Sequence, residues 1–279
     1  MLYKSIILFA LMKIALTFLC DFSVIKMQSS SSVRRNDLEL FHSELTEGQV
    51  LVDNDLTNLK AKLLAISASC DRGFAANSIE ARQIGDIIEK MELLTPVKSP
   101  TQGIYPNNRT DLPAPIEGVW RLVYTTAYDV LSLNVNPLTI TQRIFQVIRR
   151  DGSSVNIIDL VPRYQAALPP SLIGAGSTLR LKVYTSAYAR SPTRIGLQFL
   201  SVEVKPLNLF GFAVPKVFPR LKATLPQSIL YTSNVISKES GPGYFDVTFL
   251  DENMLVIRQN APGGYFVSVK DLDADFSVD

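Results

Sequence analysis

The sequence predicts a mainly β protein: an antiparallel β-barrel of about eight short strands, preceded by a helical hairpin. From residue 116 onward, apolar residues recur with a period of two, which is typical of strands. Turn signals separate these runs, and the strongest of them is Asp151-Gly152. Before residue 96 the apolar spacing is instead three and four, as in amphipathic helices. Consecutive short antiparallel strands favour a closed barrel, with a sandwich as the alternative.

Residues 1–44 are predicted to be a targeting sequence outside the fold. Lys4 precedes an apolar run that only Lys13 interrupts, which resembles a secretory signal peptide. Residues 24–35 are Ser-rich, basic and free of acids, the composition of an organelle transit peptide. Two targeting steps in series indicate a plastid surrounded by extra membranes. The alternatives are an ordinary secreted protein and a membrane anchor.

Residues 45–95 are predicted to form a helical preface. A first helix is expected over 53–70 and is followed by the stop signal Asp-Arg-Gly at 71–73. A second helix is expected from Asn77, which has capping-box spacing to Glu80, as far as Pro96. Their apolar stripes pair with each other or lie against a larger body. Residues 96–115 follow as a linker rich in Pro, Asn and Gly.

Residues 116–272 carry the predicted barrel. Its strands are expected in 116–126, 142–148, 154–161, 178–185, 194–204, 244–251, 254–259 and 264–270. The apolar phase slips near Leu200, which predicts a bulge or bend there.

Residues 205–232 do not fit the strand pattern, because four prolines interrupt a largely apolar segment. We expect an irregular loop near the barrel mouth, whose side chains form an apolar lip or plug the barrel end as core. The lip candidates are Leu209, Phe210, Phe212 and Phe218.

Several kinds of chemistry are excluded by composition. The chain has one histidine, His42, beside the targeting region, so nucleophile–histidine arrangements and His/Cys metal sites are not expected in the barrel. Cys20 lies in the leader, which leaves Cys70 without an internal disulfide partner. A net charge of +2 argues against nucleic acid as a partner. The sequence therefore predicts no catalytic residue, cofactor or metal.

A barrel of eight strands has a lumen large enough for packed side chains or for one small ligand. Binding would come from removing apolar ligand surface from water, at about 25 cal/mol per Å². Strand parity identifies residues that share a face but not which face points inward. The candidates for ligand contact are Tyr124, Phe145, Val147, Ile157, Leu181, Val183 and Phe199.

Several stretches together resemble the plastid lipid-associated proteins, also called fibrillins, over about residues 55–272. The stretches are LKAKLLAISASCDRGFAANSIEARQIGDIIEKMELLTP (59–96), IEGVWRLVYTT (116–126), QRIFQVI (142–148), YARSPTRIGLQFLSVEV (188–204) and YFDVTFLDENMLVIRQNAPGGYFVSVK (244–270). The resemblance implies a lipocalin-like, non-catalytic plastid protein at thylakoids or plastoglobules. It would bind or organise prenylquinones, carotenoids or acyl lipids, and it would meet the lipid surface peripherally.

The resemblance also suggests a structural role for the single tryptophan. Lipocalin-like barrels open on a Gly-x-Trp strand and commonly lay an arginine from the last strands across the indole. Gly118, Trp120 and Arg258 fit this description, so we expect a cation–π contact between Trp120 and Arg258 that closes the barrel. The alternative is that Trp120 is a large core residue unrelated to Arg258.

Two functions lead from the sequence, ahead of an enzyme or a partner of an enzyme. One is a carrier with a hydrophobic ligand inside the barrel. The other is a structural coat protein of plastid lipid droplets without a specific internal ligand, which uses the 205–232 segment and the helical preface against the lipid surface.

Overall fold

The computed structural model describes residues 44–106, 111–167, 176–209, 212–215, 221–224, 244–260 and 263–274. Its helices are α2 (Glu44–Ser69), η1 (Asp71–Gly73), α3 (Ser78–Leu93), α4 (Tyr128–Leu131), η2 (Ser132–Val135) and η3 (Arg163–Ala167). Its strands are β1 (Gly118–Thr125), β2 (Thr139–Ile148), β3 (Ser153–Pro162), β4 (Thr178–Ala189), β5 (Arg194–Leu209), β6 (Phe212–Ala213), β7 (Leu221–Thr224), β8 (Tyr244–Leu250), β9 (Met254–Gln259) and β10 (Gly264–Lys270).

Eight strands form a closed antiparallel barrel, which confirms the predicted fold class. The hydrogen-bonded order is β4-β3-β2-β1-β10-β9-β8-β5, and pairing of β5 with β4 closes the ring. The predicted strands correspond to β1–β5 and β8–β10. The Asp151-Gly152 turn joins β2 to β3 as expected, with Gly152 at a φ of +84°.

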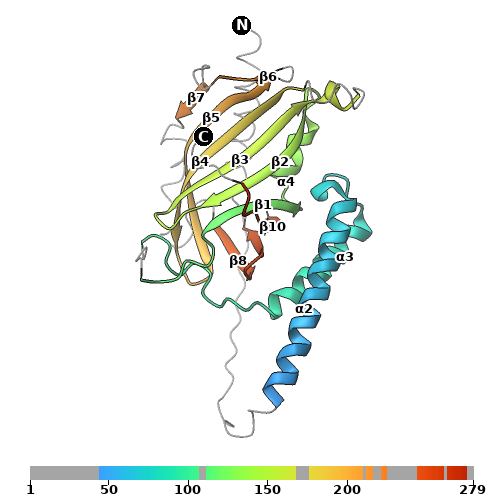
Figure 1. The fold of residues 1–279 in the computed structure, drawn as a ribbon, viewed down its shortest axis with the longest axis vertical. Helices are drawn as coiled ribbons and strands as arrows, with labels where there is room; N and C mark the ends of the chain where they lie inside the picture. The colour runs from blue at the N-terminus through green and yellow to red at the C-terminus, as the bar shows by residue number, and fades with distance from the viewer. Residues whose placement is uncertain are drawn as a thin grey trace, which may run out of the picture.

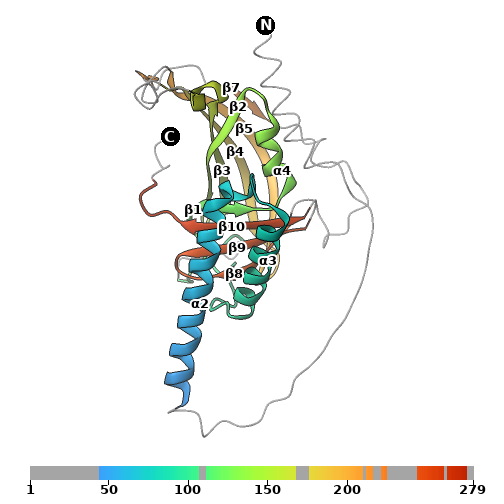
Figure 2. The ribbon, with the colours of Figure 1, turned by 90° about the vertical axis from the view of Figure 1, so that its right-hand side faces the viewer.

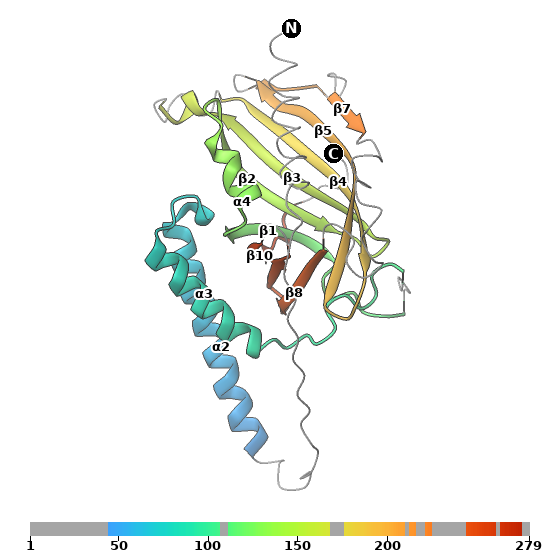
Figure 3. The ribbon, with the colours of Figure 1, turned by 180° about the vertical axis from the view of Figure 1, so that it is seen from behind.

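Strand lengths give the barrel two different ends (Figure 1). The wall formed by β2–β5 is long, whereas β1 and β8–β10 are short. We call the end that holds the start of β1 the Trp120 end. We call the opposite end, where α4 and η2 connect β1 to β2, the α4 end. Figure 3 shows β7 beside the long wall at the α4 end.

The bend near Leu200 is confirmed. The register between β4 and β5 shifts here, so that Tyr184 pairs with Ser201 while Thr185 pairs with Phe199. Leu200 is the extra residue of this bulge and is 45% exposed. Because of the bulge, Phe199 and Val202 both face the interior.

The expectation of an irregular loop over 205–232 is wrong for part of this segment. Strand β5 continues through Pro206 to Leu209, β6 pairs with its end, and β7 pairs with residues 201–204. Pro206 is tolerated because the β4 register shifts beside it, between Thr178 and Leu179. Of the remaining residues, 210–211, 216–220 and 225–232 lie outside the described residues.

The helical hairpin packs on the outside of the short strands. Figure 2 shows α2 and α3 in front of β1 and β8–β10. The apolar stripe of the helices meets the outer strand face in a cluster whose buried members are Leu63, Cys70, Ile84, Ile88, Met91, Tyr124, Phe249, Met254, Val256 and Val267. Two ion pairs border this contact, Lys60 with Asp251 at 2.7 Å and Arg258 with Glu92 at 2.7 Å.

Both helix boundaries have local causes. The predicted capping box is present at the start of α3: Asn77 Oδ1 accepts from the backbone N–H of Glu80, whose carboxylate accepts from the N–H of Asn77. The α2 helix begins at Glu44 rather than near residue 53, and it ends at the Asp-Arg-Gly turn.

The Asp-Arg-Gly turn fixes the hairpin to the barrel. Arg72 donates from its guanidinium to the carbonyl oxygens of Thr141 and Gln142 on β2. Gly73 has a φ of +99°, and a Cβ atom here would overlap the carbonyl oxygen of Thr125 on β1. Only glycine meets both conditions at low cost.

We therefore predict that Gly73→Ala destabilises the fold by at least about 2 kcal/mol, through backbone strain and steric overlap. The measurement is the free energy of unfolding from urea titration. Gly85→Ala is the matched control, because Gly85 lies inside α3 with nothing within 4 Å of an added Cβ. This control is expected to gain about 0.5–1 kcal/mol. Equal effects of the two substitutions would contradict the role of Gly73.

Candidate ligand-binding site

The barrel interior is apolar at both ends but is built from two separate clusters. At the Trp120 end, the cluster includes Trp120, Ile148, Ala187, Ile195, Leu197, Val247 and Ile257. At the α4 end, it includes Leu122, Ile144, Ile158, Leu181, Val183, Val202 and Val204. The two clusters lie on one inner face, because Ile144 and Ile148 are an even number of residues apart on β2, as are Val183 and Ala187 on β4.

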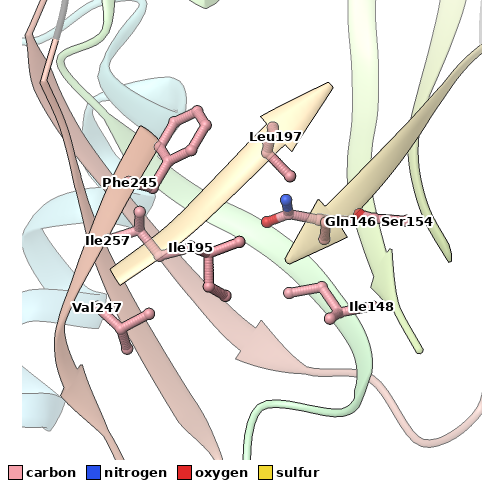
Figure 4. Close-up of a pocket in the computed structure, with 9 residues that line it drawn as sticks. Gln146, Ile148, Ser154, Ile195, Leu197, Phe245, Val247 and Ile257 are labelled. Atoms are coloured by element: carbon pink, nitrogen blue, oxygen red, sulfur yellow. The ribbon is translucent and has the colours of Figure 1, made fainter. Parts of the chain in front are cut away.

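The interior at the Trp120 end is filled by side chains. Figure 4 shows residues from β2, β3, β5, β8 and β9 converging on a small cavity. It offers about 10 Å³ to the centre of a water molecule, which is room for about one water. This cavity is too small for a lipid.

At the α4 end, the inner face of the long wall is covered by α4 and η2. Val130 and Leu133 from this segment pack against the inner cluster, as does Phe266 of β10. The start of α4 is fixed to β10, because Thr125 Oγ1 donates to the carbonyl of Tyr265 and Tyr265 N–H donates to Thr126 Oγ1. An apolar ligand that enters the barrel would meet the inner cluster of this end.

Three of the seven predicted ligand-contact residues face this interior. Leu181, Val183 and Phe199 all belong to the inner cluster of the α4 end or pack against it. Phe199 reaches the inner face through the bulge at Leu200. Their role in ligand contact stays a prediction.

The other four do not line the interior. Phe145, Val147 and Ile157 lie on the outer face of β2 and β3, where they form a cluster with Val155. The alternation of residues along the strands did not identify the inner face, because β2 and β3 carry apolar residues on both faces, as in the adjacent pair Ile157 and Ile158. Their outer face is buried too, and Ala274 packs against it after the end of β10.

Tyr124 lies on the outer face beneath the helices, because a bulge between Leu122 and Tyr124 changes the phase of β1. Its hydroxyl is buried and has no hydrogen-bond partner. Desolvation by burial, together with nearby Cys70 and Glu80, raises the pKa of Tyr124 to about 12. Tyr124 is therefore a neutral member of the helix–barrel contact.

Trp120 closes its end of the barrel, but with a different cation from the one predicted. Its indole is fully buried, and Nε1 donates to the carbonyl of Ile116 at 2.8 Å. The cation over the ring is Lys270, whose Nζ lies 5.4 Å from the ring centroid and whose residue pairs with Trp120 across β1 and β10. Gly118 has a φ of +149°, and its missing Cβ leaves space for the Lys270 side chain.

The predicted contact between Arg258 and Trp120 is wrong. Arg258 follows Ile257, whose side chain faces the interior, so Arg258 points outward. Its guanidinium lies 4.8 Å from the ring centroid of Tyr265 and forms two hydrogen bonds to Glu92. Arg258 therefore joins α3 to the barrel. Desolvation is the largest single influence on the pKa of Arg258 and lowers it, but the hydrogen bonds and charge of Glu92 outweigh it, so the pKa is raised.

Exposed apolar side chains gather at the α4 end. Of the predicted lip, Leu209 and Phe212 pair across the β5–β6 turn and are 38% and 79% exposed, while Phe210 and Phe218 lie outside the described residues. Loops and strand ends at the same barrel end add further exposed residues. We define the rim as Tyr128, Val135, Leu138, Tyr164, Leu209, Phe212 and Leu221.

Charge at this end is predominantly basic among the described residues. Arg163 and Lys222 are exposed beside the rim, and Arg143 is exposed on β2, where it pairs with Asp159 at 3.1 Å. The acids on the neighbouring wall, Asp159 and Glu203, are buried. An apolar rim with exposed cations matches the interfacial region of a lipid surface that carries anionic headgroups.

One polar pair inside the barrel was not anticipated from the sequence. Asp129 of α4 and Gln259 of β9 are 5% and 6% exposed, and Gln259 Nε2 donates to Asp129 Oδ2 at 3.4 Å. Desolvation by burial is the main cause that raises the pKa of Asp129. The only local signal was an acid within the apolar run AYDVLSL, and its partner is 130 residues away.

Two further features bear on the kind of site. Within the described part of the chain, no group of three or more His, Cys, Asp or Glu residues is arranged to hold a metal ion. None of the helices described there is long and apolar enough to cross a membrane.

A closed eight-stranded antiparallel barrel with an apolar interior and an outer helical hairpin defines the class of this protein. The PAP_fibrillin family model matches residues 57–268, so the chain belongs to this family. It is 29% identical over 248 residues to the probable plastid-lipid-associated protein 10, chloroplastic, of Arabidopsis thaliana, covering 81% of each chain.

Two more relatives show the same relationship. Plastoglobulin-1, chloroplastic, of Pisum sativum is 25% identical over 247 residues, which cover 79% of this chain and 63% of the relative. Plastid-lipid-associated protein 6, chloroplastic, of Arabidopsis thaliana is 26% identical over 219 residues, which cover 74% and 68%. No solved structure gives a significant match.

The contact between Trp120 and Lys270 can be tested by a double-mutant cycle. Trp120→Phe combined with Lys270→Met is expected to reveal a coupling of about 0.5–1 kcal/mol in the free energy of unfolding. The parallel cycle of Trp120→Phe with Arg258→Met is the control and should be additive to within about 0.5 kcal/mol. Coupling in the second cycle alone would restore the original pairing.

Burial of Asp129 predicts a definite pH dependence. Since its pKa is raised by folding, the unfolded chain ionises first as pH rises above the unfolded pKa of 3.8, and the wild type loses stability. Asp129→Asn removes this loss, so its stability relative to wild type should increase as the pH rises above 3.8 and towards the raised pKa of the folded state. Thermal or urea unfolding at several pH values measures the difference.

Asp151→Asn is the control with the opposite sign. Hydrogen bonds from Ser153 lower the pKa of Asp151, so its carboxylate stabilises the fold above the unfolded pKa. The variant should therefore become less stable than wild type as the pH rises towards the unfolded pKa. A pH-independent effect of Asp129→Asn would mean that this carboxyl is not desolvated.

Proposed function

We propose that this protein is a non-catalytic plastid protein that binds a small hydrophobic molecule in its barrel and docks peripherally on plastoglobules or thylakoids. The observation that carries the proposal is that the exposed apolar rim and the apolar interior of the long wall lie at the same barrel end. An exposed apolar rim next to an apolar interior suits a protein that docks on a lipid surface and exchanges a hydrophobic molecule with it.

The names of the three relatives support the location and the lipid association, because all three are chloroplastic and named for plastid lipids or plastoglobules. Residues 1–44 would direct the chain to a plastid through a signal peptide and a transit-like segment. Prenylquinones, carotenoids and acyl lipids are the candidate ligands that the family suggests.

The second candidate function is a coat protein of plastid lipid droplets without a specific internal ligand. The filled interior at the Trp120 end favours it, because the small cavity there leaves no room for a lipid. The rim would serve both functions, whereas only the carrier needs the interior of the α4 end.

Lipid retention separates the two functions. The purified chain is incubated with a plastid lipid extract, re-isolated by gel filtration and analysed by mass spectrometry. About one molecule of one lipid class per chain is expected for a carrier. Retention of no lipid, together with binding to intact droplets, would leave the coat function.

The rim predicts the surface that docks on lipid. Phe212→Glu is expected to reduce co-flotation with vesicles that contain anionic lipid by about tenfold or more, since a buried Phe contributes about 1.5–3 kcal/mol. Leu93→Glu is the matched control, because Leu93 is 82% exposed at the end of α3, away from the rim. Equal losses in both variants would show that the rim is not the docking surface.

A further inference from the structure

The Asp129–Gln259 pair lies at the inner face of the barrel. Gln259 follows Ile257 on the inner face of β9, and Asp129 reaches it from α4. Val130, the neighbour of Asp129, packs on the inner cluster of the α4 end. The pair therefore borders the apolar surface that an internal ligand would contact.

The hydrogen bonding of this pair is incomplete. Asp129 accepts from the backbone N–H of Val130 at 3.0 Å and from Gln259 Nε2 at 3.4 Å, whereas Gln259 Oε1 has no partner. One buried amide atom therefore lacks a partner, which is unfavourable unless another molecule supplies one.

No cation compensates the Asp129 carboxyl within the described part of the chain. Arg180 and Lys182 of the long wall are buried on its outer face, away from the inner cluster. Arg180 pairs there with Asp159. Lys270 lies at the other barrel end over Trp120. Desolvation favours the protonated carboxyl, which can donate a hydrogen bond.

We propose that Asp129 and Gln259 form the polar subsite of the ligand site and hold the neutral carbonyl or hydroxyl group of an otherwise apolar ligand. The Asp129 O–H donates to a carbonyl oxygen, and the Gln259 amide donates to it or accepts from a hydroxyl. An ionised carboxylate or phosphate is disfavoured, since it finds no cation among the described residues of the interior and would lie beside an acid. This subsite rests on the proposed function as a carrier.

This subsite would select among lipids that have similar tails but different head groups. Quinones, alcohols and other neutral isoprenoid or alkyl lipids would be retained, while free fatty acids would be rejected. A site that hydrogen-bonds a hydroxyl or carbonyl discriminates strongly against ligands that leave its buried polar groups unpaired.

The test compares probes that differ only in the head group. Hexadecan-1-ol and hexadecanoate, both delivered from cyclodextrin, are titrated into the purified full chain at about pH 8, where the free fatty acid is ionised. A benzoquinone with a hexadecyl tail is the third probe. We expect both neutral probes to bind at least about tenfold more tightly than hexadecanoate.

Variants assign this preference to the pair. Gln259→Leu keeps the size and removes both amide groups, so affinity for the neutral probes should fall about five- to twentyfold. Asp129→Asn should retain these probes, because its amide still donates. Gln142→Leu, on the exposed side of β2, is the matched control and should bind like wild type. Thermal unfolding identifies any variant that does not fold, and in that case Gln259→Met replaces Gln259→Leu.

The outcomes are distinct. Loss of neutral-probe binding in the folded Gln259 variant, with wild-type binding in the Gln142 variant, supports the subsite. Equal affinity for all probes, unchanged by substitution of Gln259, overturns the subsite while the carrier function stands. Wild-type protein that retains no probe overturns the carrier function and the subsite with it.

Discussion

Closure of the barrel through β5 is the constraint on which the rest of the structure depends. This strand pairs with β4 along most of its length but with β8 only over residues 194–196. The bulge at Leu200 allows the change, because the extra residue bends the strand and keeps apolar side chains inward on both sides of it. A closed ring has no long exposed edge, and it creates an inside and an outside from strands that are apolar on both faces.

The outer apolar face of the short strands is used by the helical hairpin. The Asp-Arg-Gly turn sets the position of α2 and α3 through backbone contacts to β1 and β2, and the ion pairs of Lys60 and Arg258 border the apolar contact. The helices therefore cover the wall at one side and leave both barrel ends to other segments. One end is closed by Trp120 under Lys270, and the other carries α4 and the rim.

This division assigns different tasks to the two ends. Close packing around Trp120 gives a filled base with room for about one water molecule. The α4 end combines an apolar inner wall, a buried polar pair with an unused hydrogen-bonding atom and an exposed apolar rim. Buried polar atoms without partners are rare in folded proteins, so the polar pair calls for a functional explanation.

The sequence by itself determined the elements: eight strands from a period of two, the capping box at Asn77, the Asp151-Gly152 turn and the bend at Leu200. These depend on interactions between residues close in the chain. Only the tertiary structure decided which strand face is inside, because Ile157 and Ile158 are equally apolar and both faces are buried. It also decided that Lys270, rather than Arg258, lies over Trp120, and that Asp129 meets Gln259. The physical reason is that such contacts depend on the register between strands far apart in the chain, which the local residue pattern does not encode.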